Sequence, residues 1–163
     1  VLLDTSSSNL WVPGVACQKD CSSFSATACD NTKFSCAFNC PDPTCCDIPL
    51  PACVSANKFN ETLSRSFTVD GTPFKLFYPG ANASGYLGED AISPRHVVLL
   101  FQFGPAGASG VLSASQLSFG IATALGGAYD ESPYDGVLGL AFPALASRGS
   151  TPPLIELVNQ GKH

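Results

Sequence analysis

The sequence predicts an all-β protein with a single domain over residues 1–163, and three observations support this. Only 13% of the residues are charged, whereas Gly (15) and Pro (13) are frequent, which is typical of short strands joined by tight turns. Several short runs place apolar residues at every second position, the period of a strand. A chain of 163 residues is also long enough to bury one hydrophobic core.

The first element is a short apolar run, Val1 to Leu3, that ends at Asp4. Small polar residues follow over 5–9, and apolar residues return over 10–12. This order predicts a buried strand, a tight turn and a second strand. Because the chain opens inside a strand and contains no Met, we interpret it as a fragment.

Residues 13–57 carry few strand signals, and about 18–56 form a cysteine-rich insertion. An even number of cysteines in a loop rich in Pro, Asn and Asp is typical of disulfides made in an oxidising compartment. The alternative is a zinc knuckle, but no His lies nearby and two adjacent cysteines fit no common zinc pattern. The pairing stays open. The disulfide candidates are Cys17, Cys21, Cys29, Cys36, Cys40, Cys45, Cys46 and Cys53.

Residues 66–92 predict a β-hairpin. Apolar residues alternate up to Tyr78, a turn follows at Pro79-Gly80-Ala81-Asn82, and residues 84–92 return. Asp70-Gly71 gives a further hairpin signal inside the first run.

The remaining elements follow an atypical segment at about 93–115, which is either an inserted strand and loop or sequence foreign to the mature protein. Residues 117–123 predict a strand and residues 137–141 a buried strand. Residues 153–160 predict one short amphipathic helix, closed by Gly161.

Charge and composition exclude some functions. The net charge of -5 offers no basic surface for nucleic acid, and no apolar run is long enough to span a membrane. Two sequons, at Asn60 and Asn82, accept N-linked glycans if the chain enters the secretory route. Together with the cysteines, they favour a secreted or lysosomal protein.

The residues around Asp4 decide whether it is a candidate catalytic group. A lone Asp beside hydroxyl residues more often forms an Asx-turn than a catalytic site. Residues 4–13 read Asp-Thr-Ser-Ser-Ser-Asn-Leu-Trp-Val-Pro, which resembles the active-site segment of pepsin-like aspartic endopeptidases except that Ser6 replaces a glycine. Residues 133–143 are similar to a second motif of that family, Phe-Asp-Gly-Ile-Leu-Gly-Leu-Ala-Tyr. Tyr78 precedes Gly85-Tyr86-Leu87-Gly88 at the spacing of the family's flap tyrosine.

The resemblance implies the N-terminal lobe of a two-lobed endopeptidase that cleaves polypeptides at acidic pH. Asp4 is then one of two catalytic aspartates, and the C-terminal lobe with the second is missing, because no other Asp-Thr-Gly or Asp-Ser-Gly occurs here. Two adjacent carboxyl groups share one proton, so one acts as a base on water and the other as an acid. No metal and no organic cofactor are implied.

The resemblance also implies supporting residues. Ser7 would hydrogen-bond Asp4, Thr5 would contact the other lobe, and Trp11 would hold the Tyr78 hydroxyl. The implied sets are Thr5, Ser6, Ser7 and Trp11 as active-site support, and Tyr78, Gly80 and Tyr129 as substrate-binding residues.

Two departures from the family support an alternative, an inactive lobe that binds peptides or inhibitors without cleaving them. Ser6 adds a Cβ that costs about 1 kcal/mol or more if its φ is positive. Pro79 removes a backbone N–H at the hairpin turn, where a glycan on Asn82 would also crowd the chain. A third possibility is a homodimer that pairs two copies of Asp4, as single-lobe retroviral-type peptidases do.

Overall fold

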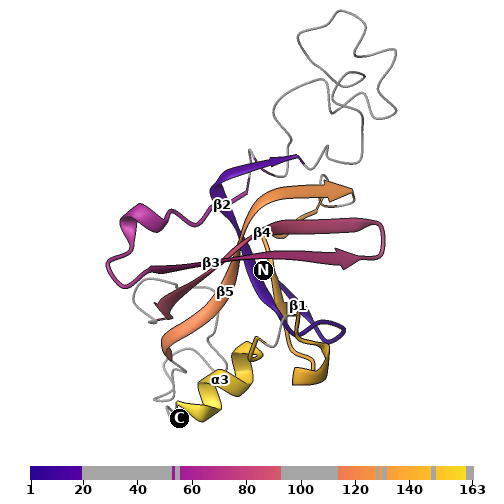
Figure 1. Cartoon of the computed structure of the whole chain (residues 1–163). Coiled ribbons are helices and arrows are strands. Elements are labelled where there is room, and N and C mark those ends of the chain that lie inside the picture. The colour runs from indigo at the N-terminus through magenta and orange to yellow at the C-terminus, as the bar shows by residue number, and fades with distance from the viewer. Residues whose placement is uncertain are drawn as a thin grey trace, which may run out of the picture.

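The computed structural model describes residues 1–19, 53, 56–92, 114–127, 129, 132–147 and 150–160. Six strands form one mixed sheet in the order β1-β6-β2-β5-β4-β3 (Figure 1). The strands are β1 Leu2–Asp4, β2 Leu10–Lys19, β3 Thr68–Tyr78, β4 Ala81–Ile92, β5 Ala114–Gly127 and β6 Val137–Gly139. The helices in these ranges are the 3-10 helices η2 Glu61–Leu63 and η4 Pro143–Leu145 and the α-helix α3 Pro153–Asn159. The predicted all-β class is confirmed.

Strand β6 lies between β1 and β2 and thereby separates the two strands that are joined by residues 5–9. It runs parallel to β1 and antiparallel to β2, and all three of its residues are buried. The strands predicted at the start of the chain and over residues 137–141 are therefore observed, but the prediction that the first strand is buried is wrong, because Leu2 and Leu3 of β1 are exposed. Their arrangement brings the chain start against a segment more than a hundred residues away.

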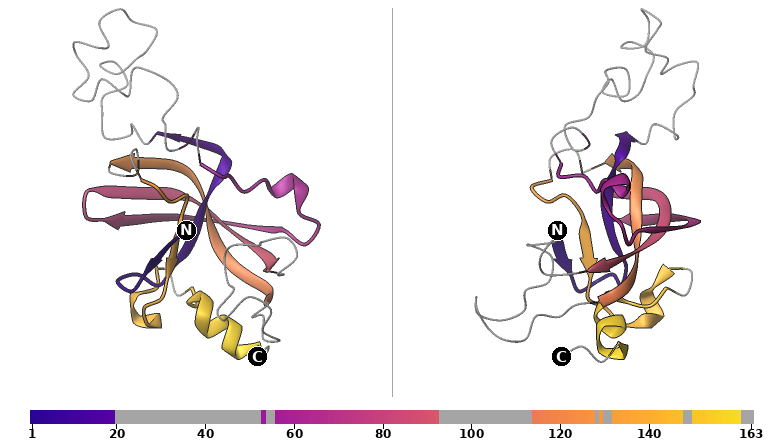
Figure 2. Two further views of the ribbon diagram at one scale, coloured as in Figure 1. Left: turned by 180° about the vertical axis from the view of Figure 1, so that it is seen from behind. Right: turned by 90° about the vertical axis from the view of Figure 1, so that its left-hand side faces the viewer.

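The long strands β3, β4 and β5 form an antiparallel meander, and the turn between β3 and β4 falls at Pro79-Gly80 as predicted. Gly80 has a φ of 74°, which favours glycine. Figure 2 shows this turn well away from α3. The sheet therefore presents a hairpin, β3–β4, whose connection is free of the helix.

The hairpin turn predicted at Asp70-Gly71 is wrong. Strand β3 continues through it, with a register shift between Val69 and Pro73, and Gly71 has a φ of 76°. The local turn signal forms a bulge because β4 offers a pairing partner on both sides of it. The Thr72 hydroxyl donates to Oδ1 of Asp70 at 2.7 Å across the bulge.

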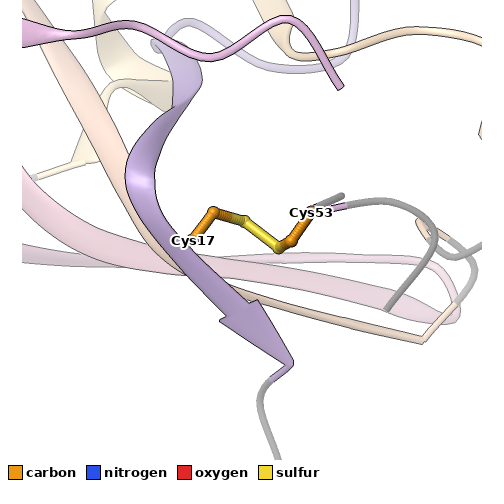
Figure 3. The surroundings of a disulfide bond; sticks show 2 residues. All are labelled: Cys17 and Cys53. Atoms are coloured by element: carbon orange, nitrogen blue, oxygen red, sulfur yellow. A yellow bond between two sulfur atoms is a disulfide. The ribbon is translucent and has the colours of Figure 1, made fainter. Parts of the chain in front are cut away.

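Strand β2 extends to Lys19, so the prediction of a loop from residue 13 onward is wrong for its first residues. Two partners explain the extension: β5 pairs with β2 in parallel, and Phe59 accepts from and donates to the backbone around Gly14. Cys17 near the end of β2 forms a disulfide with Cys53 (Figure 3). The other six cysteines lie outside the described residues.

Strand β5 begins at Ala114, which pairs with Ile92, so the last two residues of the segment marked as atypical belong to the sheet. Its other residues, 93–113, lie outside the described ranges. The helix predicted over 153–160 is confirmed as α3. Within the ranges that the structure describes, no helix has the length and apolar character needed to cross a membrane.

The buried side chains form two clusters because successive residues of a strand point to opposite faces of the sheet. Leu10, Ile121 and Leu138 belong to one cluster, which also contains Leu157 of α3. Their neighbours in sequence, Trp11, Ala122 and Val137, belong to the other, together with Phe74, Ala83, Leu125, Tyr129 and Cys53. The second cluster is the one that underlies the candidate site.

Candidate active site

Asp4 is the last residue of β1 and lies opposite Gly139 of β6. We call residues 4–9 the Asp4 turn. Leu140 donates its backbone N–H to the carbonyl of Asp4 at 2.7 Å, and Ala141 donates to the carbonyl of Ser7 at 2.9 Å. The two motifs that predicted the site are therefore side by side, and the second is the backbone scaffold of the first.

Three hydrogen bonds hold the carboxylate of Asp4. Oδ1 accepts from the backbone N–H of Ser6 at 2.8 Å and from the Ser6 hydroxyl at 2.6 Å, and Oδ2 accepts from the Ser7 hydroxyl at 2.6 Å. Burial raises the pKa of Asp4, but the hydrogen bonds from Ser6 and Ser7 together outweigh it and bring the pKa below its ordinary value. The hydrogen bonds from Ser6 and Ser7 therefore favour the charged form of Asp4.

The sequence predicted the Ser7 contact but missed the Ser6 hydroxyl as a donor. A serine two residues after an aspartate was the available signal, because such side chains readily bond within a turn. Thr5 is exposed at the same turn.

Two further side chains tie the Asp4 turn to the segment after β6, and neither was predicted. The buried Ser8 donates its hydroxyl to the carbonyl of Phe142 at 2.7 Å. Asn9 accepts from the backbone N–H of Ser147 at 3.0 Å and donates to the Ser150 hydroxyl at 2.7 Å. The partners lie far along the chain, so no local pattern could have found them.

Trp11, Tyr78 and Tyr129 form an aromatic cluster beside the Asp4 turn. The indole N–H of Trp11, which is 1% exposed, donates to the Tyr78 hydroxyl at 3.0 Å. The Tyr129 ring packs edge-on against both, with centroid distances of 5.2 Å to Trp11 and 5.9 Å to Tyr78. Tyr129 itself is 4% exposed and is therefore part of the buried core.

The Tyr78 hydroxyl couples this cluster to the Asp4 turn. Burial raises its pKa, the hydrogen bonds from Trp11 and Ser7 act against this, and the charge of Asp4 raises the pKa further. Burial also raises the pKa of Tyr129. Both phenols are therefore neutral donors or acceptors at acidic pH.

The flap tip, residues 78–81, is more exposed beyond Tyr78 than the aromatic cluster to which Tyr78 belongs. Gly80 is exposed, and no heavy atom lies within 4 Å of the place where a Cβ would stand. Pro79 supplies no backbone N–H.

Among the described residues, no group of three His, Cys, Asp or Glu side chains has an arrangement that could hold a metal ion.

Comparisons with known proteins identify the family. The family profile described as eukaryotic aspartyl protease matches residues 1–162. The chain is 31% identical to Aspartic protease 10 of Caenorhabditis elegans, with 99% of this chain and 37% of that protein covered. It is 34% identical to Aspartic protease 6 of the same species and 29% identical to Pepsin A of Suncus murinus, again over 99% of this chain, covering 31% and 30% of those proteins.

The chain belongs to the eukaryotic aspartyl protease family. It spans about a third of the length of the relatives that it matches.

Proposed function

We propose that this chain is the N-terminal lobe of an aspartic endopeptidase that hydrolyses peptide bonds at acidic pH. The observation that carries the proposal is the Asp4 carboxylate, which ends a strand, is oriented by three hydrogen bonds and lies beside the Tyr78 cluster. Family membership supports the same chemistry.

In the proposed reaction, Asp4 acts with a second aspartate from another lobe. The two carboxyl groups share one proton, because two adjacent anions are costly. Asp4, the anion, accepts a proton from water as the water oxygen attacks the peptide carbonyl carbon, and the protonated partner donates to the carbonyl oxygen. Asp4 then gives its proton to the amide nitrogen as the C–N bond breaks, and the partner carboxylate takes a proton back from the diol hydroxyl as the new C=O bond forms, which restores the starting pair.

The proposal assigns the β3–β4 hairpin to substrate binding. An extended polypeptide would lie under it, with Tyr78 and Gly80 on the substrate side and Tyr129 packed against Tyr78. Trp11 would fix the Tyr78 ring through the 3.0 Å hydrogen bond. The open space on the Cβ side of Gly80 leaves room there for a bound polypeptide.

The second lobe is part of the proposal, and two observations support it. The relatives are about three times as long as this chain. Apolar side chains also stand exposed on and near the edge strand β1, with Leu3 at 54%, Phe142 at 81% and Leu145 at 61%. Thr5, exposed at the same edge, would contact that lobe.

Replacement of Asp4 tests the function. In the full-length protein, Asp4→Asn should reduce cleavage of unfolded polypeptides at acidic pH by about 10³-fold, because an amide cannot accept the proton from water. Asp70→Asn is the matched control, since Asp70 is an exposed carboxylate that also accepts from a hydroxyl two residues later.

The outcomes separate the two functional readings. Cleavage that survives in Asp4→Asn would show that the assigned chemistry is wrong. An unmodified protein that binds polypeptides but cleaves none at any acidic pH would establish the inactive binding lobe instead, the reading that the departures at Ser6 and Pro79 favour.

We further propose that the protein is a secreted or lysosomal glycoprotein, with its glycan on Asn60. Oδ1 of Asn60 accepts from the backbone N–H and hydroxyl of Thr62 in an exposed turn, which leaves its amide nitrogen available. The amide of Asn82 lies where a Cβ on Gly126 would stand, and its Oδ1 is buried without a hydrogen bond in the described part of the chain. Glycopeptide mass spectrometry should find Asn60 occupied and Asn82 bare; the reverse pattern would refute this assignment.

A further inference from the structure

The Ser6 hydroxyl changes how many acceptor sites the Asp4 carboxylate has free. Each carboxylate oxygen can accept about two hydrogen bonds. Oδ1 receives both the N–H and the hydroxyl of Ser6, at 2.8 and 2.6 Å, so one residue occupies both of its sites. Oδ2 receives the Ser7 hydroxyl at 2.6 Å and keeps one site.

The hydroxyl is the part of this arrangement that a glycine would lack. The backbone N–H at position 6 is present whichever residue stands there, and the Ser7 contact does not depend on it. Ser6 is exposed, so burial in a core does not account for its side chain. A hydroxyl bond to a carboxylate is charge-assisted and roughly twice as strong as a bond between neutral groups.

We propose that Ser6 is a positioning residue: its hydroxyl holds Asp4 as a fixed anion with Oδ1 fully occupied, so that Oδ2 is the oxygen that takes up a proton. This inference rests on the proposed function for its role in catalysis, but the effect on Asp4 itself is a property of the turn. The hydrogen bond from the Ser6 hydroxyl thereby sets the pH range in which Asp4 is charged.

The direction of the pH effect follows from the geometry. Protonation at Oδ1 must displace one of its donors, and hydrogen bonds to the charged form of a carboxyl lower its pKa. The pKa of Asp4 is in fact below its ordinary value although burial raises it. Removing the Ser6 hydroxyl must therefore raise the pH at which Asp4 takes up its proton.

The other ionisable groups beside Asp4 do not supply this effect. Tyr78 and Tyr129 face it from the aromatic cluster, and burial raises the pKa of both, so they stay neutral in acid. Strand β6, on which Asp4 packs, consists of Val137, Leu138 and Gly139 and carries no charge. A second aspartate would couple to Asp4, and the measured values would then belong to the pair.

The test compares four forms of the full-length protein: unmodified, Ser6→Ala, Ser6→Gly and Ser6→Thr. Two quantities are measured, the titration of the ¹³C-labelled Asp4 carboxyl and the pH profile of kcat/KM for a polypeptide substrate. Ser6→Ala removes only the hydroxyl, Ser6→Gly also removes the Cβ, and Ser6→Thr keeps the donor. Thr72→Ala is the control, because it deletes a 2.7 Å hydroxyl–carboxylate bond of the same sequence spacing in the β3 bulge.

We expect the Asp4 titration and the acidic limb of the profile to move to higher pH in Ser6→Ala and Ser6→Gly. Neither should move in Ser6→Thr or Thr72→Ala. An Asp4 titration that is the same in Ser6→Ala as in the unmodified protein would overturn the proposal. A titration that moves as expected in a protein that cleaves nothing would uphold the role of Ser6 and refute the proposed peptidase function, so the two failures are distinguishable.

Discussion

The Asp4 turn and the flap tip are both short connections between strands, but the rest of the molecule holds them differently. Backbone hydrogen bonds hold the Asp4 turn, whereas the flap tip is held at its ends, by the Tyr78 side chain and by the pairing of Ala81 with Gly127. The backbone of residues 139–141 donates to three of its carbonyls, those of Asp4, Ser7 and Asn9. At the flap tip, no heavy atom lies within 4 Å of a Cβ placed on Gly80, but the carbonyl side of Gly80 packs closely on β5, where a Cβ on Gly127 would come within 2.0 Å of the Gly80 carbonyl oxygen.

The two residues that depart from the family sequence, Ser6 and Pro79, lie one in each of these connections. Ser6 lies in the turn that is held, and its hydroxyl contacts the carboxylate that would do the chemistry. Pro79 lies at the flap tip and is exposed. The residue at position 6 therefore acts directly on the Asp4 carboxylate, whereas the residue at position 79 lies in an exposed tip, although both change a motif that resembles the same family.

The largest expected difference between the Asp4 turn and the flap tip is in how a substitution at each changes the free energy of unfolding. Gly139→Ala should lower the free energy of unfolding by about 3 kcal/mol, because its Cβ would lie 2.5 Å from the backbone N of Asn9 and the backbone would have to move. Gly80→Ala meets no atom and should cost only about 1 kcal/mol for its φ of 74°. Urea unfolding of both variants measures this, and equal losses would contradict the contrast.

The second effect concerns the hydrogen bond between Tyr78, the first residue of the flap tip, and the buried Trp11. Tyr78→Phe removes the acceptor of the Trp11 indole N–H and should cost about 1–2 kcal/mol, because a buried donor is left unpaired. A double-mutant cycle with Trp11→Phe isolates the bond, since the double variant should lose less than the sum of the single ones. Additive losses would show that the hydrogen bond contributes nothing.

The smallest effect is expected at Pro79. Pro79→Gly should lower the free energy of unfolding by about 0.5–1 kcal/mol, mainly because the unfolded chain gains freedom. The pH profile of the full-length protein should stay the same, in contrast to Ser6→Ala. A shift of that profile in Pro79→Gly would break the comparison and place the flap tip in contact with the titrating group.

Much of the sheet could be predicted because strands leave a local signal. The alternation before Tyr78, the turn at Pro79-Gly80 and the apolar run before Asp4 all correspond to observed elements. The errors share one cause. At Asp70-Gly71 and beyond Pro13, pairing with a neighbouring strand overrode the local preference for a turn or loop, and the neighbour cannot be read from those residues.

The sequence by itself determined which donors can reach Asp4, because residues two and three positions away meet the carboxylate within one turn, although the Ser6 hydroxyl bond was not predicted. Only the tertiary structure decided that β6 enters between β1 and β2, and that Trp11 meets Tyr78 across a sequence separation of 67 residues. The physical reason is that such long-range contacts form when the whole sheet assembles and buries its two faces, a choice that depends on all strands at once.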